Sequence, residues 1–206
     1  MLDGIMRRAL DPRLNLVGQA LARRGVAANH VTLLGLALGL GAAGAIALGL
    51  PGWIALLPLL AGRIADGLDG AVARASNITD FGGYLDIVCD FIFYGAIPLA
   101  FVLRDPTSNG VSGGFLLMAF YANGASFLSF AILAAKRGME TKTRGVKSLY
   151  FTVGLLEGTE TIAFFVAVCL WPDAFAPLAW VFGALCIVTT VSRILLAYQV
   201  FGTEKR

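Results

Sequence analysis

Residues 66–90 read DGLDGAVARASNITDFGGYLDIVCD, and this stretch decides how the rest of the chain is interpreted. Four of its aspartates, at positions 66, 69, 86 and 90, lie in segments that are otherwise apolar enough to sit in lipid. An ionised aspartate at the centre of a bilayer costs about 2.5–3.5 kcal/mol on insertion scales. A bound divalent cation is the simplest way to offset several such charges, so the stretch predicts a metal site inside a membrane protein.

The composition of the chain agrees with a membrane location. Of the 206 residues, 58% are hydrophobic and only 14% are charged, and the mean hydropathy is +0.79; soluble domains carry about 25% charged residues. Apolar runs long enough to cross a bilayer predict an all-α fold with six membrane-spanning helices. The second and third of them contain charged residues and should score poorly on hydropathy. The predicted spans are 31–50, 53–74, 81–103, 113–135, 148–171 and 176–201.

The distribution of basic residues predicts the orientation in the membrane. Arginines precede the first span and basic residues gather between the fourth and fifth, whereas the opposite connections carry almost none. Lysine and arginine accumulate on the cytoplasmic side, so both termini are expected there. Residues 1–27 place apolar residues at near-helical spacing between arginines, which predicts an amphipathic helix on the membrane surface. Residues 28–206 then form the six-helix bundle of a single domain.

The spacing of the acidic residues places them on two helix faces. Asp66 and Asp69 stand three residues apart, and Asp86 and Asp90 stand four apart, so each pair shares one side of a helix. Two antiparallel helices joined by a short polar turn point all four carboxylates toward one another. Oxygen donors without a nearby histidine or cysteine suit Mg²⁺ or Mn²⁺, and four carboxylates are enough for two ions.

Small residues and one arginine accompany these carboxylates. Gly70 and Ala73 share the face of Asp66 and Asp69, and Gly82 shares the face of Asp86. They leave room beside the metals for a bulky group, and Arg74 is placed to meet a phosphate. The combination predicts a site for a diphosphate and the chemistry of phosphoryl transfer.

The segments DGLDGAVAR and GGYLDIVCD together resemble the signature of the CDP-alcohol phosphotransferases, D-x2-D-G-x2-A-R followed by G-x3-D-x3-D. The chain departs from the family in its spacer, since residues 75–81 number seven where eight or nine are usual. The resemblance implies that four aspartates hold the metals and that Asp90 is the general base. It also implies a homodimer and a cytidine diphosphate site. The residues implied for that site are Gly70, Ala73, Arg74 and Gly82.

Two residues at the start of the first span resemble a further family element, P-N-x2-T. Asn29 and Thr32 match it, and Ala28 replaces the proline. The resemblance assigns both to the CDP site. Asn29 could equally be the N-cap of the helix, with Thr32 in its first turn.

The acceptor end of the site is predicted from three charged residues in the last two spans. Glu157 and Glu160 lie in span 148–171 and Arg193 in span 176–201. Glu157 either pairs with Arg193 or Arg63, or meets the ammonium group of an acceptor alcohol. Arg193 has the alternative of holding a phosphate on the acceptor. Residues 94–98 are also similar to a stretch in the phosphatidylserine synthase branch of the family.

We therefore expect an integral membrane transferase that moves a phosphatidyl group from CDP-diacylglycerol to a small polar alcohol such as serine, with release of CMP. The same chemistry on glycerol 3-phosphate or an inositol phosphate is the alternative. A divalent-cation transporter would explain the aspartates, although not the glycines and the arginine beside them. We expect a bacterial inner membrane location with the active site on the cytoplasmic side, lipid as surroundings and no nucleic-acid partner.

Overall fold

The computed structural model describes residues 3–139 and 158–202, and the structured part of these ranges is helical, as predicted. Because residues 140–157 lie outside the described ranges, the count of six spanning helices stays a prediction. The elements are α1 (Asp3–Arg23), α2 (Ala28–Ala47), α3 (Gly52–Ala75), α4 (Asp80–Arg104), α5 (Pro106–Lys136), α7 (Gly158–Leu170), the short 3₁₀ helix η1 (Pro172–Ala174) and α8 (Phe175–Phe201).

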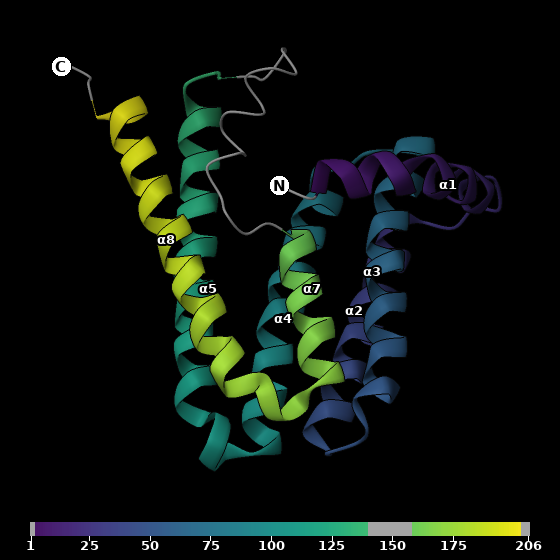
Figure 1. Cartoon of the computed structure of the whole chain (residues 1–206). Coiled ribbons are helices and arrows are strands. Elements are labelled where there is room, and N and C mark those ends of the chain that lie inside the picture. Colours follow the sequence, from purple (N-terminus) through teal and green to yellow (C-terminus); the bar gives the residue numbers. More distant parts are fainter. Residues whose placement is uncertain (1–2, 140–157, 203–206) are drawn as a thin grey trace.

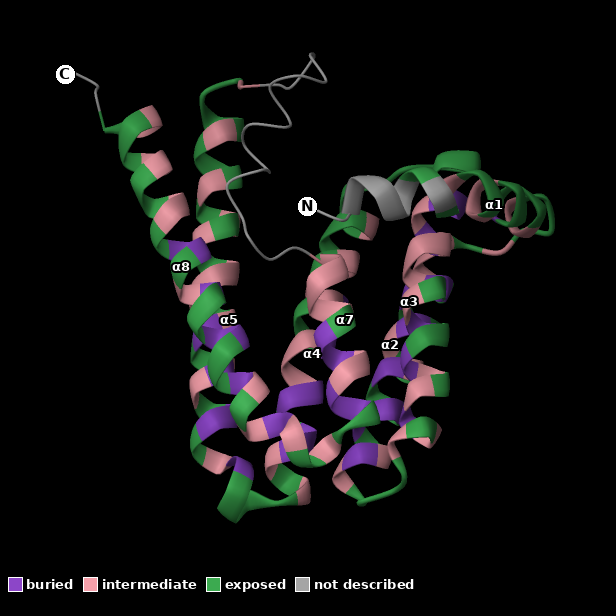
Figure 2. Cartoon of the chain, in the orientation of Figure 1, coloured by how far each residue is buried: buried purple, intermediate pink, exposed green. Residues whose placement is uncertain are grey.

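The long helices run side by side, and α1 lies across one end of the bundle (Figure 1). The C-terminal end of α8 lies at the same end as α1, as an even number of membrane crossings between them requires. That both termini are cytoplasmic remains a prediction. Most buried positions lie in the half of the bundle farther from α1 (Figure 2). Fewer positions are buried in the half nearer to α1, which contains the acidic stretch (Figure 2).

Four segments of the described chain are long and apolar enough to cross a membrane: α2, α4, α5 and the stretch Pro172–Phe201. Helix α7 is apolar but shorter over its described residues. Helix α3 falls outside this set, as expected of a helix that carries Arg63, Asp66 and Asp69. The expectation for 81–103 was wrong, because α4 reaches a hydropathy of 1.9 despite its aspartates. Its long run of apolar residues after Asp90 outweighs the two charges.

Aromatic rings fill the core of the bundle. Phe93, Phe165 and Phe101 are fully buried, and Phe93 meets Phe165 edge-on with ring centroids 5.6 Å apart. Phe101 stacks on Phe175 at 4.6 Å, which joins α4 to the start of α8. These contacts fix α4 against its neighbours below the acidic residues.

Small residues let α2 approach α3 and α4 closely. A Cβ atom added to Gly62 would lie 2.9 Å from the carbonyl oxygen of Gly35, and one added to Gly39 would lie 2.6 Å from the Phe93 ring. The Gly35-x3-Gly39 pair therefore serves helix packing within this chain. Close packing of α2 is what brings its first turn to the acidic site.

Candidate metal and nucleotide site

The acidic residues lie on the helical hairpin formed by α3 and α4. Helix α3 carries Asp66 and Asp69, and α4 carries Asp86 and Asp90. The start of α4 is fixed by Thr79, whose hydroxyl accepts a 3.0 Å hydrogen bond from the backbone N–H of Gly82. The seven-residue spacer thus holds a defined N-cap, and Asp86 still faces the aspartates of α3.

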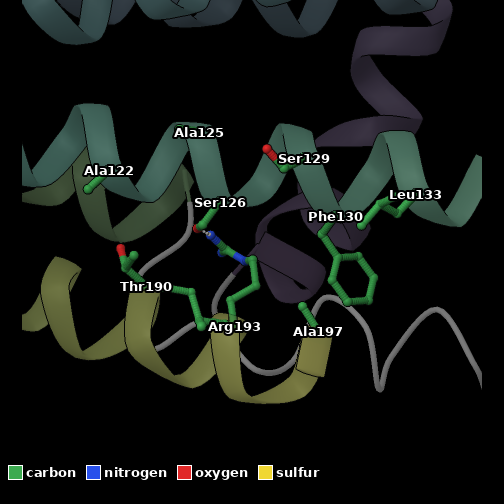
Figure 3. Close-up of a pocket in the computed structure, with 10 residues that line it drawn as sticks. Ala122, Ala125, Ser126, Ser129, Phe130, Leu133, Thr190, Arg193 and Ala197 are labelled. Atoms are coloured by element: carbon green, nitrogen blue, oxygen red, sulfur yellow. Dashed lines mark hydrogen bonds between the residues drawn. The ribbon is translucent and has the colours of Figure 1, made fainter. Parts of the chain in front are cut away.

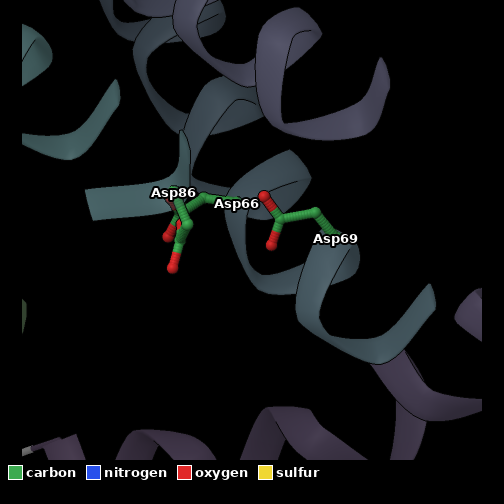
Figure 4. Close-up of side chains that lie close together, drawn as sticks. All are labelled: Asp66, Asp69 and Asp86. Atoms are coloured by element: carbon green, nitrogen blue, oxygen red, sulfur yellow. The ribbon is translucent and has the colours of Figure 1, made fainter. Parts of the chain in front are cut away.

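Three of the carboxylates form a compact cluster. Asp66, Asp69 and Asp86 each offer one oxygen, and these three atoms lie within 4.8 Å of one another (Figure 4). Asp69 is only 6% exposed, and its Oδ2 atom is buried without a hydrogen-bond partner among the described residues. A buried anionic oxygen without a donor is costly. The donor set and this orphaned oxygen both fit a hard divalent cation.

Asp90 is not one of these three carboxylates, and an arginine of α3 contacts it directly. The Arg63 guanidinium donates a 2.8 Å hydrogen bond from Nη1 to Asp90 Oδ1, and the same nitrogen lies 3.5 Å from Asp66 Oδ2. The guanidinium carbon of Arg63 lies over the Phe93 ring, 4.1 Å from the centroid. Arg63 was missed as a site residue in the sequence. Its position three residues before Asp66, on the same helix face, was the available signal.

The residues expected to bind the nucleotide come together from three helices. Asn29 in α2 places its Oδ1 atom beside Gly82, where an added Cβ would lie 3.3 Å from it. The Thr32 hydroxyl donates a 3.2 Å hydrogen bond to the Ala28 carbonyl oxygen and lies near the Asp69 carboxylate. The N-cap interpretation of Asn29 is wrong, because the N-cap of α2 is Ala27 and no side chain caps the helix. Asn29 is already inside the first turn, so its side chain is available to the neighbouring helix.

Gly70 and Arg74 lie one turn apart at the end of α3. A Cβ atom on Gly70 would lie 3.3 Å from Arg74 Nη1, so the missing side chain makes room for the guanidinium. Ala73 is half-buried on the same turn. Arg74 is exposed and donates a 3.0 Å hydrogen bond from Nη2 to Asn15 Oδ1 in α1.

Helix α1 also packs directly against α3. At Gly18 an added Cβ would lie 2.6 Å from Ala71 Cβ and 2.8 Å from the Ala71 carbonyl carbon, so α1 crosses α3 in direct backbone contact. Asn15 lies one turn earlier on α1. The amphipathic pattern of α1 gave no sign of this contact, because it depends on where the two helices cross.

The predicted acceptor residues are described only in part. Glu157 lies outside the described residues, and Glu160 is half-buried in the first turn of α7. Arg193 of α8 donates from Nη1 to the Asn123 side-chain and backbone oxygens, at 2.8 and 3.0 Å, and to Ser126 Oγ at 2.7 Å. Among the described residues, its partners are thus on α5. These partners were not identified from the sequence.

Arg193 lines a cavity between α5 and α8. The cavity measures about 410 Å³, and its walls are mostly apolar (Figure 3). Figure 3 shows the Arg193 side chain reaching across to Ser126 between the two helices. Small side chains keep this space open: Ala122, Ala125 and Ala197 all line it.

Comparisons with known proteins identify a family and relatives for this chain. A family model described as CDP-alcohol phosphatidyltransferase matches residues 25–192. The Escherichia coli protein named inner membrane protein YnjF is 45% identical over 208 residues, which cover the whole of both chains. An uncharacterized protein of Aquifex aeolicus is 32% identical over 201 residues, covering 95% of this chain and 89% of that protein.

One solved structure supports the fold. It is a phosphatidylinositol phosphate synthase of Mycobacterium tuberculosis with CDP-DAG bound. It superposes with a TM-score of 0.65, covers 94% of this chain and 98% of its own, and is 20% identical in sequence. The likeness extends over the helical bundle as a whole.

Proposed function

The chain belongs to the CDP-alcohol phosphatidyltransferase family, and on this premise we propose that it transfers a phosphatidyl group from CDP-diacylglycerol to the hydroxyl of a small polar alcohol. The acceptor oxygen forms a bond to the lipid-side phosphorus, and the bond from that phosphorus to CMP breaks. The observation that carries the proposal is the cluster of three carboxylate oxygens within 4.8 Å of one another. Arg74 lies about two turns after Asp66 on the same helix, α3.

The metal assignment rests on the chemistry of the donor set. The four aspartates would hold Mg²⁺ or Mn²⁺, and four carboxylates are enough for two ions. When bound, a divalent ion supplies positive charge to the diphosphate and makes an acceptor hydroxyl more acidic. Asp90 takes the proton of that hydroxyl. Since Arg63 bonds Asp90 Oδ1, we assign the proton to Oδ2.

The nucleotide is held where α2, α3 and α4 meet. Arg74 pairs with a phosphate of the diphosphate group, and its exposed position is open to a ligand. Gly70 and Gly82 remove side chains where the substrate approaches the backbone. Asn29 lies beside Gly82 and offers an amide that can both donate and accept hydrogen bonds. Thr32 and Ala73 complete the proposed CDP site.

For the acceptor we propose an amino alcohol such as serine. Glu157 and Glu160 supply negative charge near the start of α7, which suits an ammonium group. The second candidate, a phosphorylated acceptor such as glycerol 3-phosphate or inositol phosphate, is favoured by Arg193 and the cavity that it lines. Three side-chain and backbone oxygens orient the Arg193 guanidinium, so it offers a fixed charge to an anion.

We place the protein in the inner membrane, as the name of the E. coli relative indicates for that protein. The acidic stretch lies in the half of the bundle nearer to α1, the end we assign to the cytoplasm. We also propose a homodimer, as in the family. Family membership places the chain among enzymes, so the divalent-cation transporter is not proposed.

The proposal is tested by measuring CMP release from CDP-diacylglycerol with purified protein, Mg²⁺ or Mn²⁺, and a panel of alcohols. We expect release with at least one acceptor, and its loss in Asp86→Asn. Asp80→Asn is the matched control, because Asp80 is exposed at the start of the same helix and lies outside the cluster. No release with any acceptor, or equal loss in the two variants, contradicts the proposal.

The two acceptor classes are separated by a pair of variants. With serine as acceptor, Glu157→Gln should raise the KM for the alcohol, and Arg193→Ala should change it little. If Arg193→Ala raises that KM strongly while Glu157→Gln leaves it unchanged, the amino-alcohol assignment is wrong. The phosphorylated acceptor then takes its place.

A further inference from the structure

Arg63 is a charged group at the site that lies outside the family signature and has so far served only to orient Asp90. Its side chain is only 14% exposed, and it makes close contacts to two of the four aspartates. Its Nε atom is buried without a hydrogen-bond partner among the described residues. A guanidinium this deep in a membrane protein is costly unless neighbouring anions offset its charge.

Three contacts fix the position of this charge. Nη1 lies 2.8 Å from Asp90 Oδ1 and 3.5 Å from Asp66 Oδ2, and the guanidinium carbon lies 4.1 Å from the Phe93 ring centroid. Phe93 is fully buried in the core, so the ring is a rigid support. Arg63 therefore cannot leave the acidic site without losing both its anions and its aromatic contact.

The four carboxylates thus divide into two environments. Asp66, Asp69 and Asp86 present oxygens to a common point, and Asp66 lies 3.5 Å from Arg63 Nη1, farther than the 2.8 Å of Asp90. Asp90 already has a permanent positive charge at hydrogen-bonding distance. A second divalent ion at Asp90 would stand close to a guanidinium of the same sign, and in a low-dielectric site this repulsion is strong.

We infer that Arg63 acts as a built-in cation at Asp90 and takes the place of one divalent ion, so that the substrate-free protein binds a single ion. A second ion then enters only with the diphosphate of the substrate, whose negative charge offsets the added repulsion. This inference rests on the proposed function only in that it takes the aspartate cluster to be the metal site.

The test counts Mn²⁺ ions on the full-length protein in detergent micelles without substrate, by equilibrium dialysis and by the electron paramagnetic resonance signal of the bound ion. Wild-type protein should bind one ion per chain with the spectrum of an isolated Mn²⁺. Arg63→Leu should bind a second ion at least about tenfold more tightly than wild type does. Arg63→Lys keeps the charge and should still bind one.

Two further variants serve as a substitute for Arg63→Leu and as a control. Arg63→Gln removes the charge but retains donors for Asp90, so it replaces Arg63→Leu if that variant does not fold. Arg104→Leu removes the same charge at the other end of α4, where Arg104 bonds the Leu50 carbonyl oxygen, and it should bind one ion like wild type.

The outcomes are distinct. Wild-type protein that binds two ions of similar affinity without substrate overturns the inference, and so does a neutral Arg63 variant that still binds one. If CMP release is normal in that same preparation, the proposed function stands. Wild-type protein that binds no Mn²⁺ and releases no CMP overturns both.

Discussion

Gly18 offers a way to test whether α1 helps to form the nucleotide site. We consider Gly18→Ala, which adds one methyl group where α1 crosses α3. The new Cβ would lie 2.6 Å from Ala71 Cβ, 2.8 Å from the Ala71 carbonyl carbon and 3.0 Å from the Val72 nitrogen. Two of these three atoms belong to the backbone and cannot rotate away. Helix α1 must therefore move away from α3 by most of an ångström.

The expected loss of stability and rise in KM follow from two contacts. Overpacking of this kind costs about 1–3 kcal/mol of stability. The 3.0 Å hydrogen bond between Arg74 and Asn15, one turn from Gly18, lengthens beyond hydrogen-bonding range when α1 moves. Because this bond is exposed, we assign it about 1 kcal/mol, the order of a typical net hydrogen bond. If Arg74 loses its orientation toward the diphosphate, the KM for CDP-diacylglycerol rises about five- to tenfold.

The assay is CMP release in mixed micelles at varied CDP-diacylglycerol, with KM and kcat determined separately. Gly44→Ala in α2 is the matched control, because an added Cβ there meets nothing within 4 Å. The double variant Gly18→Ala with Ala71→Gly removes the closest contact and should recover part of the loss. If Gly18→Ala behaves like Gly44→Ala in both KM and thermal stability, α1 does not position Arg74 and the reasoning is refuted.

Three further predictions follow from the site. Asn15→Ala should raise the KM for CDP-diacylglycerol about threefold to tenfold with little change in kcat, because Arg74 loses its partner while the carboxylates are untouched; an equal fall in kcat would count against a role in nucleotide binding. Asp90→Asn should abolish CMP release yet leave binding of a cytidine nucleotide largely intact, measured by calorimetry, and loss of that binding would make Asp90 chiefly a metal ligand. Arg137→Ala should lower the melting temperature without changing the KM for either substrate, since Arg137 bonds the Val200 and Phe201 carbonyl oxygens at the end of α8; a raised acceptor KM would instead place Arg137 at the acceptor.

The α3–α4 hairpin shows how much of the site can be predicted from the spacing of residues within a helix. Residues three, four or seven positions apart share a helix face wherever the helix lies, so the clustering of Asp66, Asp69 and Asp86 could be predicted. The prediction also held despite the short spacer, because Thr79 caps α4 and Asp86 still faces Asp66 and Asp69. It failed for Asn29, where Ala27 rather than Asn29 precedes the first turn of α2, since helix starts are poorly determined by composition alone.

By itself, the sequence determined the helical class, the membrane character, the acidic faces and the family signature, because each depends on composition or on spacing within one or two helices. The tertiary structure decided which groups meet across the bundle. Arg63 reaches Asp90 over 27 residues, Arg74 reaches Asn15 over 59, and Arg193 reaches Asn123 over 70. Such pairs are set by the places where helices cross, and those depend on how glycines such as Gly18 and Gly62 let backbones approach. No periodicity in a single helix records that geometry.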